Sequence, residues 1–135
     1  MKLQNQRGAS LIEVMIAVGM FLIGMEALLA VATQSIAHAK RAEYVYTASS
    51  LAKNHIERLR AYSFSALASA AETDTVIDAD GDADPAGQFE RTTTVTTNYT
   101  GDPDLTQLTV SVKFSMQGVL SAQAMSASCV MFNEG

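Results

Sequence analysis

The residues able to do chemistry lie in two parts of the sequence. Near the N-terminus, the carboxylates of Glu13 and Glu26 interrupt the almost entirely apolar window 11–32. A charge inside a membrane-spanning helix costs about 2.5–3.5 kcal/mol, so such a residue indicates a function and a partner. In the second half, alternate positions carry carboxylates: Asp78, Asp80, Asp82 and Asp84. Alternating carboxylates beside a glycine are the hard oxygen ligands that Ca²⁺ requires.

The apolar window has the length of a membrane span. As a helix, residues 11–32 would extend about 33 Å, and the hydrocarbon core of a membrane is about 30 Å thick. Lys2, Arg7 and the small pair Gly8-Ala9 all precede the window, whereas a cleaved secretory signal has its small-residue site after the apolar stretch. The order predicts a leader of residues 1–8 followed by a retained helix.

A cut between Gly8 and Ala9 would create a charged amine close to Glu13. The carboxylate could then pair with the amine of its own chain, or with that of a neighbouring chain and so determine a stagger. The alternative is that Glu13 extends toward the membrane interface without a partner. We assign no partner to Glu26, which follows Glu13 by about 20 Å along a helix.

The N-terminal string resembles a known processing signal. RGASLIEVMIAVGMFLIG, residues 7–24, is similar to the class III signal of type IV pilins and type II secretion pseudopilins. The resemblance implies that a prepilin peptidase cuts after Gly8 and N-methylates Ala9, and that Glu13 is the assembly glutamate. The chain departs from the usual pattern at Ala9, where Phe or Met is common, and in having no Pro in the helix.

A second string narrows the resemblance. LAKNHIERLRAYS, residues 51–63, resembles PilV-type minor pilins, the type IV pilus modification proteins, and the I-type minor pseudopilins are similar there too. The resemblance implies an α+β, type IV pilin-like fold, with a long N-terminal helix whose C-terminal half packs on a small antiparallel sheet. It also implies these partners: other minor and major pilins, the prepilin peptidase, the inner membrane, the assembly platform and a tip adhesin. The chain would lie in the inner membrane as a single-pass protein before assembly, and then in the pilus at the cell surface.

The composition excludes several classes of protein. Of 135 residues, 48% are apolar and 17% are charged, which excludes an intrinsically disordered chain. The net charge of −5 argues against contact with nucleic acid. The single Cys129 excludes an intrachain disulfide and leaves a buried free thiol or an intermolecular disulfide. We find no motif of a common enzyme class and expect no catalytic residue.

The pattern of the remaining residues predicts the other elements. Apolar residues at spacings of three and four predict an amphipathic helix: Val45, Ala48, Ala52, Ile56 and Leu59. Three strands are expected at 89–100, 108–116 and 119–132, with turns at 101–104 and at Gln117-Gly118. The predicted organisation is leader 1–8, membrane or filament-core helix 9–33, amphipathic continuation 34–62, and soluble sheet head 63–135 with an acidic loop at 72–90.

The acidic loop departs from the EF-hand pattern. Counted from Asp78, the sixth position is Ala83 rather than Gly, and the twelfth is Phe89 rather than Glu. Ca²⁺ binding by the four aspartates and a solvated loop without a ligand both stay open.

Three functions are consistent with these observations. The first is a minor pilin in the tip or priming complex of a type IV pilus. The second is a minor pseudopilin of a type II secretion system, which relies on the same processing and packing. The third is a single-pass membrane protein with a ligand-binding soluble domain, which would leave Gly8-Ala9 uncut and Glu13 unexplained.

Overall fold

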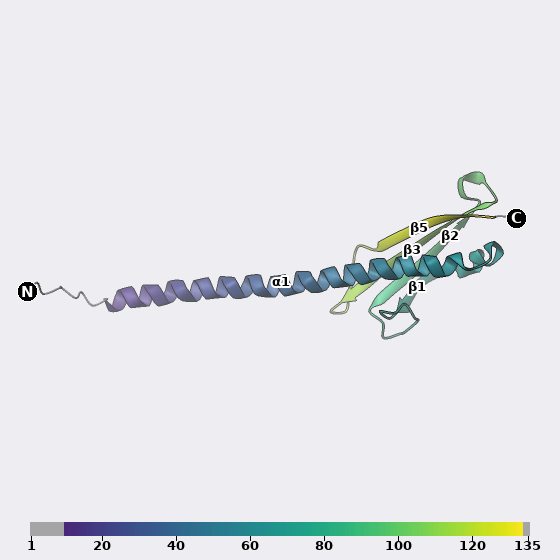
Figure 1. Ribbon diagram of the computed structural model, residues 1–135. Helices are drawn as coiled ribbons and strands as arrows, with labels where there is room; N and C mark the ends of the chain where they lie inside the picture. The colour runs from purple at the N-terminus through teal and green to yellow at the C-terminus, as the bar shows by residue number, and fades with distance from the viewer. Residues whose placement is uncertain (1–9, 134–135) are drawn as a thin grey trace, which may run out of the picture. The chain divides into compact units, whose positions relative to one another are not determined.

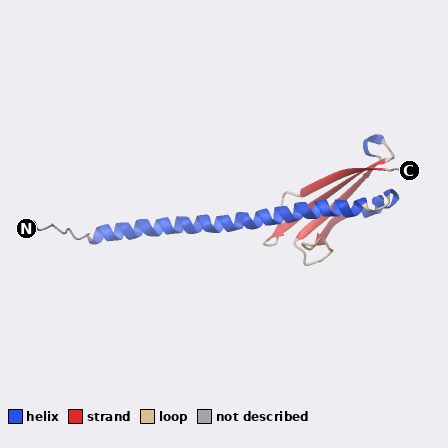
Figure 2. Ribbon diagram, in the orientation of Figure 1, coloured by secondary structure: helices blue, strands red, loops and turns tan. Residues whose placement is uncertain are grey.

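The computed structural model describes residues 10–133 and divides into two units, 1–40 and 41–135. The helices and strands are α1 (Leu11–Arg60), η1 (Phe64–Ala70), β1 (Glu72–Ile77), β2 (Phe89–Thr97), η2 (Tyr99–Gly101), β3 (Leu105–Met116), β4 (Val119–Leu120) and β5 (Met125–Phe132). A long N-terminal helix followed by an antiparallel sheet confirms the α+β prediction (Figures 1 and 2).

The sheet is antiparallel throughout and is centred on β3. β1 pairs with β2, and β2 pairs with β3. β4 and β5 each pair with β3. The edge strands of the sheet are therefore β1 on one side and β4 and β5 on the other. Figure 1 shows β2, β3 and β5 side by side. β3 has partners on both sides, and its alternating pattern supplies four of the twelve buried core residues.

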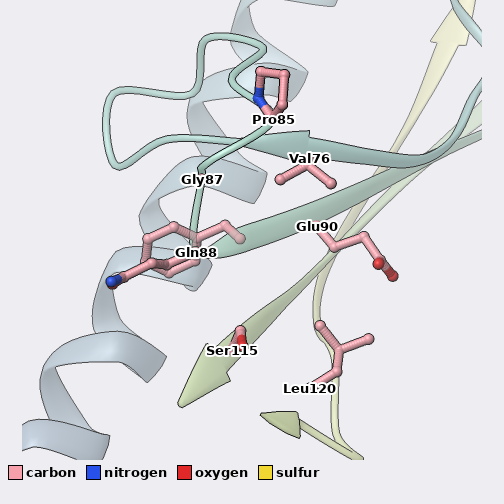
Figure 3. Close-up of a pocket in the computed structure, with 8 residues that line it drawn as sticks. Val76, Pro85, Gly87, Gln88, Glu90, Ser115 and Leu120 are labelled. Atoms are coloured by element: carbon pink, nitrogen blue, oxygen red, sulfur yellow. The ribbon is translucent and has the colours of Figure 1, made fainter. Parts of the chain in front are cut away.

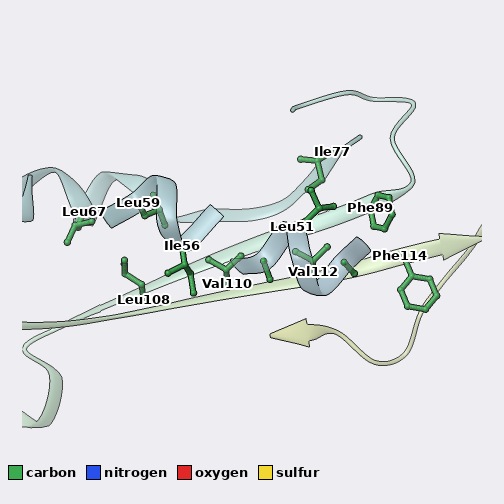
Figure 4. Close-up of a cluster of buried hydrophobic side chains, with 12 residues drawn as sticks. Leu51, Ile56, Leu59, Leu67, Ile77, Phe89, Leu108, Val110, Val112 and Phe114 are labelled. Carbon is green, nitrogen blue, oxygen red and sulfur yellow. The ribbon is translucent and has the colours of Figure 1, made fainter. Parts of the chain in front are cut away.

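The core of the C-terminal unit lies between the sheet and the last four turns of α1. Helix residues Ala48, Leu51, Ala52, Ile56 and Leu59 are buried against the apolar residues of the strands (Figure 4). Leu108, Val110 and Val112 are fully buried, and the residues between them are only half-buried. The alternation that predicted this strand and most of the helical face that predicted this packing are confirmed. Leu51 joins the face, and Val45 lies half-buried at its edge.

The predicted turn at Gln117-Gly118 is confirmed. It joins β3 to β4 through the pair Met116 and Val119, and both turn residues have positive φ, 53° and 78°. Two successive residues with positive φ match the right-handed twist of a two-residue hairpin. Glycine adopts this conformation without strain, which accounts for Gly118 at the second position.

The structure corrects four predicted boundaries. The strand predicted at 89–100 ends at Thr97, and η2 follows it. The segment 72–90 is not one loop, because β1 occupies Glu72–Ile77 and β2 begins at Phe89. The last strand is not continuous over 119–132 but is divided into β4 and β5 by residues 121–124. The strand predicted at 108–116 begins three residues earlier, at Leu105. In each case cross-strand pairing decides the boundary, and local composition gives little information about such pairing.

Candidate functional site

The N-terminal unit presents an apolar helical surface. Its most exposed large side chains include Leu11, which is 80% exposed, and Leu28, which is 73% exposed. Within residues 10–133, α1 is the one helix that is long and apolar enough to cross a membrane, judged by length and composition. This surface is compatible with a membrane anchor or with a signal sequence. Water disfavours an apolar surface of this extent, so it requires lipid or other protein to cover it.

Glu13 lies in the first turn of α1 and is exposed. The backbone N–H of Glu13 donates to Ser10 O at 2.9 Å, so the helix begins directly before it. Among residues 10–133, no basic group lies within ion-pair distance of the Glu13 or Glu26 carboxylate. Gly8 and Ala9 lie outside the described residues, so the pairing of Glu13 with an Ala9 amine stays a prediction.

The hydroxyl of Thr33 follows directly after the apolar window. Its Oγ1 lies 3.1 Å from Leu29 O and 2.9 Å from Ala30 O, one turn earlier in the same helix. A threonine hydroxyl that bonds the preceding turn is satisfied without water. The helix therefore presents no unsatisfied polar side chain at this position, where the predicted membrane segment ends.

Asp78 is the first residue of the acidic loop, which is the segment 78–88 between β1 and β2, and it organises the turn there. Its Oδ1 accepts the backbone N–H groups of Asp80, at 3.0 Å, and of Asp82, at 2.9 Å. Its own N–H donates to Asp82 O at 2.9 Å, which closes the turn. The hydrogen bond from the Asp82 backbone is the main reason that the pKa of Asp78 lies below its ordinary value. The carboxylate of Asp78 thus holds the turn together.

The other predicted calcium ligands have different partners. Asp84 Oδ1 accepts the N–H of Ala86 at 2.9 Å, and Asp82 Oδ1 lies 3.9 Å from Arg58 Nη1. Within residues 10–133, no three Asp, Glu, His or Cys side chains form a group that could hold a metal ion. Ca²⁺ binding by the four aspartates stays a prediction, which calorimetry on the detergent-solubilised chain would test.

A buried ionic cluster connects the loop, the sheet and the helix. Arg91, which is 8% exposed, donates from Nε and Nη2 to Glu72 Oε2, at 3.2 and 2.9 Å. Its Nη1 donates to the carbonyl of Gly81 at 3.0 Å. One guanidinium therefore holds β1 and the acidic loop against β2. A buried charge is tolerated when its hydrogen bonds are satisfied in this way.

His55 of α1 borders this cluster without a hydrogen bond. Its Nε2 lies 3.5 Å from Glu72 Oε1, and within the described residues neither ring nitrogen has a hydrogen-bond partner. Burial lowers the pKa of His55 from its ordinary value, and the nearby positive charge of Arg91 lowers it further. The pull of Glu72 in the opposite direction does not offset these two effects.

The cluster was not predicted, although the sequence contains one signal for it. Arg91 alternates with Phe89 and Thr93 in the predicted strand, so all three must face the same side of the sheet. An arginine on a buried face requires a carboxylate partner. Nothing in the local sequence indicates which acidic residue that partner is, and the pairing of β1 with β2 supplies Glu72.

The surface of the C-terminal unit is hollowed at two places among others. One, of about 210 Å³, lies between the end of β1, the segment 85–88 and β4, with Val76, Pro85 and Leu120 among its lining residues (Figure 3). Glu90 and Ser115 also line this hollow, and no histidine or cysteine does. The other hollow lies between α1 and β5 and includes Cys129, a half-buried free thiol.

Comparison with family models, curated proteins and solved structures returned no match to this chain. The sequence motifs and the geometry of the helix and the sheet are therefore what indicates a function.

Proposed function

We propose that the protein is a minor pilin that is processed by a prepilin peptidase and takes part in type IV pilus assembly. The observation that carries the proposal is Glu13, a carboxylate in the first turn of an exposed apolar helix that has no ion-pair partner among residues 10–133. It follows the Gly8-Ala9 pair by four residues. A chain that functions alone gains nothing from such a carboxylate, whereas a chain that packs beside others can pair it.

The proposed mechanism is polymerisation rather than catalysis. The peptidase would remove residues 1–8 and leave a methylated amine on Ala9. The helix would be stored in the inner membrane, where lipid covers its apolar side chains. On extraction, the same side chains would pack against the helices of neighbouring subunits. Glu13 would neutralise the amine of the next subunit, so that neither charge is buried alone.

The C-terminal unit would form the exposed part of the subunit. Its core is formed entirely by residues between Ala48 and Phe114, so it does not rely on the apolar half of the helix. Such a unit can contact other minor pilins or a tip adhesin while the helix is held in the filament. The resemblance to PilV-type minor pilins supports a position in the tip or priming complex.

The processing step is tested by Gly8→Ala and Glu13→Ala, with Glu26→Ala as the matched control. Both of the first variants should stay in the membrane fraction and be missing from sheared pili. Glu26 lies in the same apolar window but far from the new amine, so its variant should still enter pili. Intact-mass measurement should show that the wild type begins at a methylated Ala9. Normal incorporation of Gly8→Ala would refute the proposal.

Deletion of the gene distinguishes a role in the pilus from a role in type II secretion. Sheared surface pili and proteins secreted into the medium should be measured in the same cultures. Loss of pili with normal secretion supports the minor pilin. Loss of secretion with normal pili would assign the chain to a type II secretion system. An unchanged phenotype with an N-terminus still at Met1 would favour the single-pass membrane protein.

A further inference from the structure

The two edges of the sheet are protected very differently. At β1, the register slips between Glu72 and Thr75, which is a bulge that interrupts the edge. Farther along the strand, Ile77 pairs with Ala83 of the loop, and Asp84 N donates to Val76 O at 3.1 Å. A bulge and a covering loop are devices by which proteins prevent an edge from pairing with another chain.

The edge formed by β5 has no comparable protection. Its eight residues pair with β3 in an unbroken register, from Met125 opposite Val112 to Phe132 opposite Leu105. The sequence MSASCVMF contains no charged residue and no proline. A regular, uncharged edge strand of this length is a template for another strand.

The register identifies which backbone groups of β5 point away from β3 and could bond to another strand. Asn133 N donates to Asp104 O at 2.9 Å, so Asn133 faces β3 with its backbone. Backbone groups of an antiparallel strand alternate in direction, so every second residue from here faces the other way. The outward residues are Ser126, Ser128, Val130 and Phe132. Among residues 10–133, no strand pairs with them on that side.

A groove runs along this edge beside α1. It has a volume of about 330 Å³ and lies between helix residues 53–60 and strand residues 126–129. Ile56, Ala127 and Cys129 give it an apolar part, and the last two are only half-buried. A strand added to β5 would place alternate side chains over Ala127 and Cys129 and complete their burial.

The charges along the groove indicate the chemistry of the added strand. Arg60 Nη1 is paired with Glu57 Oε1 at 3.0 Å. Lys53 is exposed and has no ion-pair partner within residues 10–133. The β5 strand of a second copy contains no carboxylate that could pair with Lys53. The β1 edge of a second copy is protected by its bulge and covering loop. A different chain is therefore favoured over self-association.

We infer that the outer edge of β5 binds an extended acidic segment of another polypeptide by strand addition. The backbone groups of Ser126, Ser128, Val130 and Phe132 form the ladder, and Lys53 pairs with a carboxylate of the added segment. The inference does not depend on the proposed role in a pilus, and its test does not involve pili.

The test uses the full chain in detergent micelles and end-blocked octapeptides that alternate Val and Thr. In the probe peptides, Glu replaces each Thr in turn, and in the control peptides Lys takes the same positions. Amide hydrogen exchange is followed by NMR. At free peptide near ten times Kd, the amides of Ser126, Ser128, Val130 and Phe132 should exchange about tenfold more slowly. The amides of β1 should not change.

Two variants at one position isolate the backbone contribution. Ser128→Pro removes an outward donor at a position where an edge strand tolerates proline, and Ser128→Ala keeps the donor. The proline variant should bind the Glu peptide about tenfold or more weakly, and the alanine variant should bind it like the wild type. If thermal unfolding shows that Ser128→Pro is unfolded, Val130→Pro provides the same comparison, and the exchange data on the wild type stand without a variant.

The charge contribution has its own variant. Lys53→Gln should weaken binding of the Glu peptide by about two- to fivefold. The variant should also bind the Glu peptide and the Lys peptide with equal affinity. The inference is overturned if the four amides show no protection with any Glu peptide. It is also overturned if Ser128→Pro binds as the wild type does, or if the four amides are already protected in a self-associated free protein.

Discussion

Arg91 shows how one side chain can hold together three parts of the C-terminal unit. It belongs to β2, bonds Glu72 of β1 and bonds the carbonyl of Gly81 in the acidic loop. Removing the guanidinium would leave two acceptors without a donor. The cost of such a change is set by the orphaned partners more than by the lost ion pair itself.

We predict that Arg91→Met lowers the free energy of unfolding by about 2 kcal/mol, because Glu72 is still partly exposed and regains some hydration. Lys113→Met is the matched control. Lys113 Nζ lies 3.8 Å from Glu90 Oε1 in a more exposed pair, so its loss should cost less than about 1 kcal/mol. Urea denaturation of both variants measures the difference. Equal losses would contradict the role assigned to Arg91.

His55 should make the C-terminal unit sensitive to mild acid. Its pKa in the folded chain is lowered, so the unfolded chain binds the proton more readily. The contribution of His55 to stability is therefore fully present above its unfolded pKa of about 6.5. This contribution is lost as the pH falls from there toward the pKa of His55 in the folded chain. Thermal melts between pH 7.5 and 5.5 should show that Tm decreases as the pH falls. The free energy of unfolding should fall by at most about 1.4 kcal/mol per pH unit for one proton.

The two histidines of the chain provide the control for this prediction. His55→Gln should remove the pH dependence in this range, and His38→Gln should keep it, because His38 is exposed in the N-terminal unit. A slope that persists in His55→Gln would show that another group is responsible. Asp78 also has a lowered pKa, but its contribution is lost only below about pH 4.

Among the described strands, β3 contributes the most buried residues to the core, four of twelve. It has neighbours on both sides, and its inward side chains meet those of α1. β4 is only Val119–Leu120, and both of its residues are exposed. The two strands join at one hairpin, yet their contributions to stability should differ strongly.

We predict that Leu108→Ala destabilises the protein by about 2–5 kcal/mol, because it leaves a cavity beneath a fully buried position. Leu120→Ala removes the same atoms from a side chain that is 42% exposed, and should cost less than about 1 kcal/mol. Denaturant midpoints of the two variants provide the measurement. A small effect at Leu108 would mean that the core between α1 and β3 is wrongly assigned.

At the scale of the whole molecule, the two units satisfy their apolar residues in different ways. The C-terminal unit has a buried apolar core of its own. The N-terminal unit leaves Leu11, Met20 and Phe21 more than 60% exposed, which requires an environment supplied from outside the chain.

We therefore predict that residues 41–135 fold without the N-terminal unit. A fragment of this range should be soluble without detergent and should melt cooperatively in circular dichroism. The full chain should require detergent or lipid, because its apolar helix is exposed in water. An aggregated or non-cooperative fragment would contradict the independence of the core.

Local pattern in the sequence is sufficient for part of this structure. The 3.6-residue spacing predicted the buried face of α1, strict alternation predicted β3, and Gln117-Gly118 predicted the hairpin. The apolar window predicted the exposed apolar part of the helix, and the role of Glu13 stays a prediction. Each of these features depends on neighbours within about seven residues, which periodicity describes well.

The remaining features were decided by tertiary structure. β1 was missed because its acidic sequence resembles a loop until β2 provides hydrogen-bond partners. Glu72 as the partner of Arg91, and β5 as the unprotected edge, likewise depend on which strands lie side by side. Strand pairing joins residues far apart in the chain, and its energy comes from contacts that no local segment contains. The sequence by itself therefore determined the long helix, the central strand β3 and its hairpin turn, and only the fold determined β1 and the partners of each strand.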